Sequence, residues 1–218
     1  MHDKRAKLEP DCTYHIFTRA NGSEKLFKTK ENYRFFLERY GHYIQPLAET
    51  FCYCLMPNHF HFLVRIKGEK ELTQYVSAQT GSSKTLQGFG TLEGLERQSA
   101  ISKFLSQRFS HLLNGFTQAF NKQQGRKGSL FMHPFKRKKV TDDKYLLKLI
   151  HYIHFNPIEA GLAQEPEDWK FSSYCTIISS APTWLSRTKV IDCFGSLENF
   201  IHCHTYPPEI TGIEDLYP

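Results

Sequence analysis

Two histidines separated by a single residue are the strongest chemical signal in the sequence. His59 and His61 open the segment His-Phe-His-Phe-Leu-Val, which has the residue types of a β-strand. Side chains alternate between the two faces of a strand, so both imidazoles point to one face while Phe60 and Phe62 point to the other. At about 6.6 Å along the strand, two imidazoles can converge on one cation. The alternative is that both are polar residues of a half-exposed strand.

A second group of polar side chains shares one face of a predicted helix. Helical geometry places Tyr152 and Asn156 one turn apart and about 40° apart around the axis, and Tyr145 extends the same stripe. His154 lies about 200° from Tyr152, so we expect it to take no part in the same site. The alternative is a packing helix whose tyrosines belong to the core.

Positive charge is concentrated in the first two thirds of the chain. Residues 97–141 contain ten Lys or Arg and no Asp or Glu, and residues 1–156 have 25 basic against 13 acidic residues, a net +12. Residues 157–218 reverse the balance, with nine acidic and three basic residues. This asymmetry indicates a polyanionic partner on one face, with a solvated lysine-rich surface as the alternative.

The elements that must position these residues follow the order β-α-β-β-α-β. We predict strands at 13–19, 50–55, 59–66 and 130–140, and helices at 30–44 and 102–121. That order is typical of an α+β, ferredoxin-like antiparallel sheet. Pro134 predicts that the last strand lies at an edge or contains a bulge.

A further helix, which includes Tyr152, is expected to follow the sheet. It begins after a capping Thr141 and ends at Asn156, because Pro157 disfavours helical geometry in the residue before it. We therefore predict a domain over 1–156, with a polar insertion at about 67–100 that is mobile at its tip. Residues 157–218 are expected to form a tail packed on that core through scattered aromatic residues.

Composition excludes several classes of protein. No apolar stretch approaches the roughly 20 residues of a membrane span. The first residues lead into no apolar segment, so no secretory signal is expected. Six cysteines in 218 residues are too sparse for a disulfide scaffold and are typical of reduced thiols, so we expect a cytoplasmic protein with no membrane association.

Three segments of the chain together resemble a known family. They are 56–64 (Met-Pro-Asn-His-Phe-His-Phe-Leu-Val), 152–162 (Tyr-Ile-His-Phe-Asn-Pro-Ile-Glu-Ala-Gly-Leu) and 169–174 (Trp-Lys-Phe-Ser-Ser-Tyr). In this order they resemble the single-tyrosine HUH transposases, most closely the branch of REP-associated tyrosine transposases. The resemblance extends from about residue 13 to residue 174.

The resemblance implies a reaction and assigns roles to four residues. His59, His61 and Asn156 would hold a divalent metal, Mg²⁺ or Mn²⁺, for which an amide oxygen is a suitable hard ligand. Tyr152 would attack a DNA phosphodiester and leave a 5′-phosphotyrosine and a free 3′-hydroxyl. The expected activity is that of a transposase: a single-stranded DNA endonuclease and strand transferase that acts on hairpin-forming DNA, as a monomer or a homodimer.

The DNA contacts are expected from the basic residues near the last strand. They are Lys136, Arg137, Lys138 and Lys139, with Arg19 as a further phosphate contact or, alternatively, part of a surface salt bridge. We expect core packing rather than base stacking for the aromatic residues Tyr14, Phe131 and Phe135.

Two other functions are considered. One is a domesticated protein that binds single-stranded or hairpin DNA without cutting it, although such a protein need not keep His59, His61 and Tyr152 together. The other is a replication initiator of the same superfamily, which finds no support because the chain contains no Walker-type phosphate loop.

Overall fold

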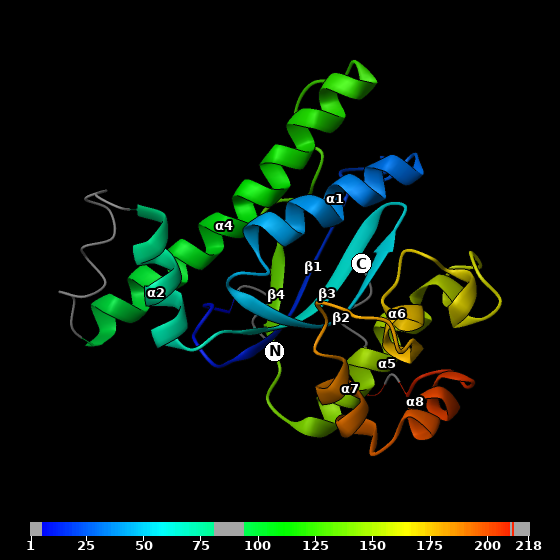
Figure 1. Ribbon diagram of the computed structural model, residues 1–218. Helices are drawn as coiled ribbons and strands as arrows, with labels where there is room; N and C mark the ends of the chain where they lie inside the picture. Colours follow the sequence, from blue (N-terminus) through cyan, green and yellow to red (C-terminus); the bar gives the residue numbers. More distant parts are fainter. Residues whose placement is uncertain (1–5, 81–93, 210, 212–218) are drawn as a thin grey trace.

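A four-stranded antiparallel sheet forms the centre of the computed structural model, which describes residues 6–80, 94–209 and 211 (Figure 1). The strands are β1 (Thr13–Arg19), β2 (Ala48–Met56), β3 (His59–Ile66) and β4 (Lys136–Lys139). Their order across the sheet is β2-β3-β1-β4, and every pair is antiparallel. This is the arrangement expected of a ferredoxin-like split sheet. The predicted α+β class is therefore confirmed.

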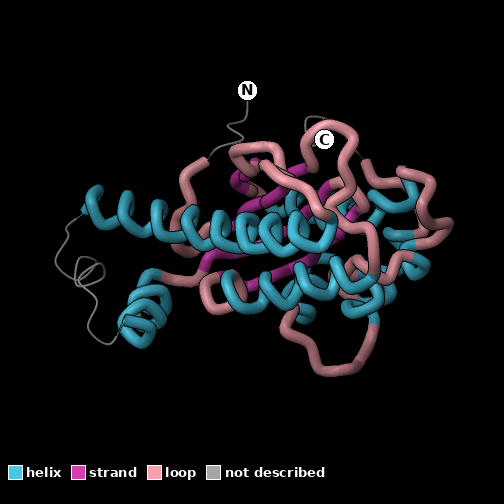
Figure 2. Tube along the Cα trace, turned by 90° about the horizontal axis from the view of Figure 1, so that it is seen from above, coloured by secondary structure: helices cyan, strands magenta, loops and turns pink. Residues whose placement is uncertain are grey.

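Helices α1 (Lys30–Tyr43) and α4 (Gly94–Gln124) pack against each other over one face of the sheet (Figures 1 and 2). Aromatic rings fill the layer between them and the strands: Phe36 contacts Phe60, with ring centroids 5.1 Å apart, and Tyr40 stacks on Phe62 at 4.2 Å. Phe116 of α4 contacts Phe36 at 5.1 Å. Phe60 and Phe62 point into this layer, so the residues that alternate with them on β3, including His59 and His61, face the other side of the sheet.

Most of the described part of the predicted polar insertion at 67–100 is helical. Residues Glu69–Thr80 form helix α2, and α4 begins at Gly94 rather than Ser102. The first turns of α4 contribute no buried side chain before Ile101, so the sequence has no apolar periodicity there that would predict a helix. An ion pair of 2.9 Å between Arg97 and Glu69 joins these turns to α2. The expected mobile tip falls on residues 81–93, which lie outside the described residues.

The last strand is shorter than predicted. Only Lys136–Lys139 pairs continuously with β1, and Phe131 makes a single isolated bridge to Ala20. Pro134 lies between these two points and has no N–H for a ladder hydrogen bond, which explains the interruption. The expectation that this strand lies at an edge is confirmed.

Helix α5 (Asp143–Glu159) covers the opposite face of the sheet and differs from the prediction at both ends. Its cap is Asp142, whose side chain accepts a hydrogen bond from the Tyr145 N–H, rather than Thr141. The helix does not end at Asn156 but continues through Pro157 to Glu159. It ends in a Schellman motif, because the Gly161 N–H donates to Ile158 and the Leu162 N–H donates to Pro157.

Gly161 supports the first testable prediction, which concerns stability. Its φ of +66° lies in the left-handed region and a Cβ there would meet nothing within 4 Å, so the cost of Gly161→Ala is backbone strain alone. We expect the variant to lose about 1 kcal/mol of unfolding free energy in urea denaturation. The matched control is Gly41→Ala inside α1, where a Cβ makes ordinary contacts and stability should rise by about 0.5–1 kcal/mol. Equal effects at both positions would contradict the assigned motif.

The chain after α5 forms short helices around α5 and the β2 edge of the sheet (Figure 1). They are η1 (Pro166–Asp168), α6 (Tyr174–Ile178), α7 (Arg187–Phe194) and α8 (Leu197–His204). The Trp169 indole N–H donates to the Leu55 carbonyl at 3.0 Å, and Phe200 is fully buried. Within the described ranges, no helix has the length and apolar character needed to cross a membrane.

Candidate functional site

The histidine pair lies on the face of the sheet that α5 covers. His59 stands opposite Arg19 on β1, and His61 stands opposite Phe17. Both histidines belong to β3, an inner strand of the sheet with β2 on one side and β1 on the other. Neither is half-exposed: His61 is 0% and His59 7% exposed. The alternative reading as polar residues of a half-exposed strand is therefore excluded. Two imidazoles this deep in a sheet need partners or a ligand.

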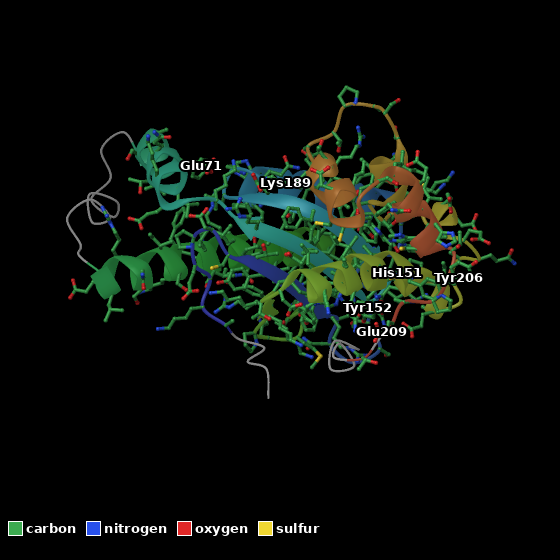
Figure 3. The ribbon with its side chains drawn as sticks, turned by 90° about the horizontal axis from the view of Figure 1, so that it is seen from below. Glu71, His151, Tyr152, Lys189, Tyr206 and Glu209 are labelled. Carbon is green, nitrogen blue, oxygen red and sulfur yellow. The ribbon has the colours of Figure 1, made fainter. Side chains whose placement is uncertain are left out.

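Helix α5 brings Tyr152 and Asn156 to the same place (Figure 3 labels Tyr152 on this helix). The Tyr152 ring meets His61 edge-on, with centroids 5.6 Å apart and planes at 83°. The Asn156 side-chain oxygen lies 3.2 Å from Nε2 of His59. The Asn156 amide nitrogen donates to the Tyr152 carbonyl at 3.1 Å, which leaves the oxygen facing the histidine. The structure thus gathers the two histidines, the tyrosine and the asparagine into one cluster.

His154 is absent from this cluster, as the helical spacing predicted. Its Nε2 lies 2.7 Å from the Ser173 hydroxyl, and its Nδ1 lies 3.1 Å from Nε2 of His204. It therefore joins α5 to the C-terminal helices on the far side of the helix.

Burial keeps both histidines of the pair neutral. Desolvation lowers the pKa of His59 to about 4, with a further lowering by the positive charge of Arg19 and a partial opposite effect from Asn156. Desolvation also holds the pKa of His61 well below its usual value, assisted by the neighbouring imidazoles of His15 and His59. A neutral imidazole has a lone pair, which is the form that binds a metal.

Hydrogen bonds decide which nitrogen of each ring has that lone pair. Both ring nitrogens of His59 face amide oxygens, Nδ1 that of Asn58 at 2.8 Å and Nε2 that of Asn156 at 3.2 Å, but a neutral imidazole has one proton to donate. The shorter contact favours the proton on Nδ1, which leaves the lone pair on Nε2. In His61, Nδ1 lies 2.8 Å from Nε2 of His15, and when His61 donates in this pair its lone pair is on Nε2. That Nε2 is buried and has no hydrogen-bond partner among the described residues.

The donor set fits a divalent cation. With Nδ1 of His59 protonated, two acceptors, its Nε2 and the Asn156 oxygen, face each other at 3.2 Å. Neighbouring ligands of an octahedral ion with bonds near 2.1 Å are about 3 Å apart, so this separation matches two ligands of one ion. The unpartnered Nε2 of His61 supplies a third donor. The amide oxygen is a ligand of the kind that Mg²⁺ and Mn²⁺ prefer, and imidazoles bind first-row divalent ions, so the set is compatible with a divalent cation.

No competing metal site is found in the parts of the chain that the structure describes. Among those residues, no group of three or more His, Cys, Asp or Glu side chains is placed to hold a metal. A metal at the cluster would therefore use the Asn156 amide beside the two histidines.

His15 and Asn58 are contributors that sequence reasoning missed. His15 lies on β1 and is fully buried, and its ring stacks on His61 with centroids 5.0 Å apart. A signal was available, since His15, Phe17 and Arg19 alternate along a strand that had to neighbour His59 and His61. Recognising it required the register between β1 and β3, which fixes the two imidazoles side by side. Both residues orient the candidate ligands rather than joining them.

The five basic residues expected to contact DNA do not form one surface. Arg19 lies at the end of β1 opposite His59, and the ammonium group of Lys136 lies 5.6 Å over the Phe17 ring. Strand alternation places Lys138 on the same face as Lys136, but Lys138 is 2% exposed, with its ammonium group 4.8 Å over the Tyr145 ring. These three residues share the face of the histidine pair.

Arg137 and Lys139 point to the other face of β4 and have partners within the protein. Arg137 donates to the Ala6 carbonyl at 2.6 Å and to the Ser106 hydroxyl at 2.9 Å. Lys139 forms an ion pair with Glu9. The expected aromatic contributors are core residues, as predicted: Tyr14, Phe131 and Phe135 are all buried.

The buried histidine pair between α5 and α8, His154 and His204, gives the second testable prediction. Burial lowers the pKa of His204 to about 3, partly offset by the hydrogen bond to the Phe200 carbonyl. Below pH 6.5 the unfolded chain takes up a proton here that the folded chain does not, so stability is complete above 6.5 and falls as the pH drops toward 3. We expect a loss of about 2 kcal/mol from this histidine by pH 5, measured by urea denaturation at several pH values. His204→Asn should lessen the slope, and an unchanged slope would contradict the prediction.

Comparison with known proteins finds one curated protein and one solved structure that this chain resembles. No model of a protein family matches it. A protein of Haemophilus influenzae named "Putative REP-associated tyrosine transposase" is 23% identical over 128 residues, which are 58% of this chain and 58% of that protein. A solved structure of a REP-associated tyrosine transposase bound to a REP hairpin covers 84% of this chain and 89% of that chain, with a TM-score of 0.57 and 14% identity. The likeness to the second shows a common fold. Together the two confirm the resemblance that the three sequence segments indicated.

Proposed function

We propose that this chain, which resembles the REP-associated tyrosine transposases in sequence and fold, cuts and rejoins single-stranded DNA beside a hairpin through a covalent bond to Tyr152. The observation that supports this most directly is the meeting of Tyr152 with a cation-binding set on two different elements. His61 on β3 contacts the tyrosine ring, and His59 faces Asn156 one helical turn after it. The matched part spans 58% of the H. influenzae relative, so activity and substrate are proposals for this chain.

His59, His61 and Asn156 would hold Mg²⁺ or Mn²⁺. A divalent cation held by these residues would supply Lewis-acid chemistry, that is, charge neutralisation at a non-bridging phosphate oxygen. The protein's part is to keep two imidazoles neutral by burial and to fix their rings through Asn58 and His15. Neutral, oriented ligands lose little entropy on binding, which raises affinity.

Tyr152 provides the nucleophile. Its phenolic oxygen forms a bond to phosphorus as the bond from phosphorus to the 3′ oxygen breaks, so the 5′ phosphate stays on the tyrosine and the DNA keeps a free 3′-hydroxyl. The phenol loses one proton and the departing oxygen gains one. The phosphotyrosine keeps a phosphodiester bond, so a 3′-hydroxyl can attack it and rejoin strands without ATP.

Substrate entry requires the cluster to open. Tyr152 is 1% exposed and lies between α5 and the sheet, so a phosphodiester reaches it only after α5 or its neighbours shift. A single strand can bend into such a space, whereas a stiff duplex cannot. Arg19 and Lys136 lie on this face of the sheet and would contact phosphates.

The test incubates the full chain with 5′- and 3′-labelled single strands that contain a hairpin, with Mn²⁺, with Mg²⁺ or with EDTA. We expect a protein–DNA adduct that survives denaturation, formed only with a metal and containing the 5′ end created by cleavage. Binding without an adduct on any such strand would favour the alternative, a hairpin-binding protein that does not cut. Cleavage without an adduct would contradict the tyrosine mechanism.

A further inference from the structure

A basic, aromatic cleft lies outside the cluster described above. It has a volume of about 480 Å³ and separates the first half of α1 from the segment that follows η1. Lys30 and Arg34 line it from α1, while Trp169, Lys170 and Phe171 line it from the other side. None of the residues assigned to the metal or to the reaction belongs to it.

The charge of the cleft is positive and available to a ligand. Lys30, Arg34 and Lys170 are exposed, and within the described part of the chain none of them forms a salt bridge. Asp168 is the acidic residue of the lining, and its side chain accepts hydrogen bonds from the backbone N–H groups of Gln164 and Glu165. Lys170 is one of only three basic residues in segment 157–218, which has nine acidic residues, so it brings a positive charge to the cleft from a segment that is negative overall.

The aromatic side chains of the cleft are held in fixed orientations. The Trp169 indole is anchored by its hydrogen bond to the Leu55 carbonyl. Phe171 stacks on Tyr33 with ring centroids 3.7 Å apart and planes within 8°, and the Trp169 and Phe171 rings stand at 77° to each other. Both Trp169 and Phe171 are half-buried, so part of each ring faces the cleft. Fixed rings beside unpaired cations form a stacking surface for bases with contacts for the phosphates between them.

The cleft lies at the same end of the sheet as the histidine pair. Leu55, which anchors Trp169, is followed by Met56, and Met56 pairs with His59 across the β2–β3 hairpin. Figure 1 shows that the start of α1, the tip of this hairpin and the chain between α5 and α6 come together on one side of the molecule. A strand that leaves the cluster past the start of β3 therefore meets the cleft.

We propose that this cleft binds unpaired nucleotides of a DNA strand that continues from the cleaved phosphodiester. The assignment rests on the proposed function for the identity of the strand, while the cleft itself is argued from its own charge and rings. A duplex hides its base faces, so the ligand is single-stranded. The cleft would help set the position of the strand before Tyr152 can react.

Tryptophan fluorescence gives a direct test, since the chain has two tryptophans. Trp184→Phe leaves Trp169 as the reporter, and Trp169→Phe leaves Trp184, which packs on Tyr40 and Tyr53 away from the cleft. In EDTA, we titrate each variant with an oligothymidylate of about ten nucleotides. Quenching is expected for the Trp169 reporter and not for the Trp184 reporter. An unquenched Trp169 at saturating DNA, with binding verified by anisotropy, overturns the proposal.

A charge test complements the fluorescence. We expect Arg34→Ala/Lys170→Ala to weaken oligothymidylate binding about tenfold or more and to reduce its salt dependence. The matched control is Lys70→Ala/Lys103→Ala, which removes two exposed charges on α2 and α4 that form no salt bridge with any residue the structure describes. Thermal unfolding checks that both variants fold. If both double variants weaken oligothymidylate binding equally, the proposed cleft site is overturned, because the attraction is then diffuse and electrostatic.

The outcome is separable from that of the proposed function. Quenching without any covalent adduct keeps the cleft as a single-strand site and removes the nuclease. An adduct without quenching keeps the nuclease and removes the cleft.

Discussion

Tyr152→Phe is expected to abolish formation of the covalent protein–DNA adduct while DNA binding stays within about twofold of the wild type. The substitution removes the one atom of Tyr152 that forms a bond in the proposed reaction, and loss of a nucleophile in enzymes that depend on one lowers the rate by about four to six orders of magnitude. The ring is buried against His61, and phenylalanine fills the same space. We therefore expect the fold and the DNA affinity to survive. Denaturing gels with labelled DNA measure the adduct, and fluorescence anisotropy measures binding.

Tyr145→Phe is the matched control, because Tyr145 is on the same helix and nearer its start. Its ring packs against the Lys138 ammonium at 4.8 Å. We expect adduct formation close to that of the wild type. If Tyr152→Phe still forms the adduct and Tyr145→Phe does not, the nucleophile is Tyr145 and our assignment is wrong.

The sequence was sufficient for those parts of the fold that depend on local periodicity. β1 and β3 were predicted with the residues they have, because aromatic and β-branched residues alternate within clear boundaries. The 3.6-residue period placed Tyr152 and Asn156 together and sent His154 to the other side of α5. Both cases required only the geometry of one element.

The failures have different physical causes. Of its described side chains, helix α2 buries only the short apolar pair Leu72 and Val76 within a polar segment, and the first turns of α4 bury no side chain before Ile101. The helix end at Asn156 was misjudged because the steric preference against a residue before proline is smaller than the packing and capping that continue α5. At this position, tertiary packing outweighed the backbone preference of the residue before proline.

The candidate site shows the same division. Alternation could pair Lys136 with Lys138 but could not tell which face of β4 meets α5, so Arg137 and Lys139 were grouped with them. His15 required knowledge of the strand register, which long-range pairing sets. Burial of the cluster was also not visible in the sequence, although it determines the protonation of His59 and His61.

His59→Ala is expected to weaken Mn²⁺ binding by at least about 100-fold and to abolish metal-dependent adduct formation. Loss of an outer-shell partner alone costs about 10- to 100-fold in metal affinity, and His59 would be a direct ligand opposite the Asn156 oxygen. Isothermal titration of the DNA-free protein with Mn²⁺ measures binding without reference to activity, and the labelled-strand assay measures the adduct.

The control and the pH response make this prediction specific. His42→Ala removes an exposed imidazole from α1 on the opposite face of the sheet and should leave Mn²⁺ binding unchanged. Since burial already lowers the pKa of His59 to about 4, protons compete with the metal only in acid, and Mn²⁺ affinity should stay level from pH 8 down to about 5. A site made of ordinary exposed histidines would lose affinity near pH 6.5. Such a loss in the wild type, or undiminished Mn²⁺ binding by His59→Ala, would show that the ion binds elsewhere, because the neutrality of His59 follows directly from its burial under α5.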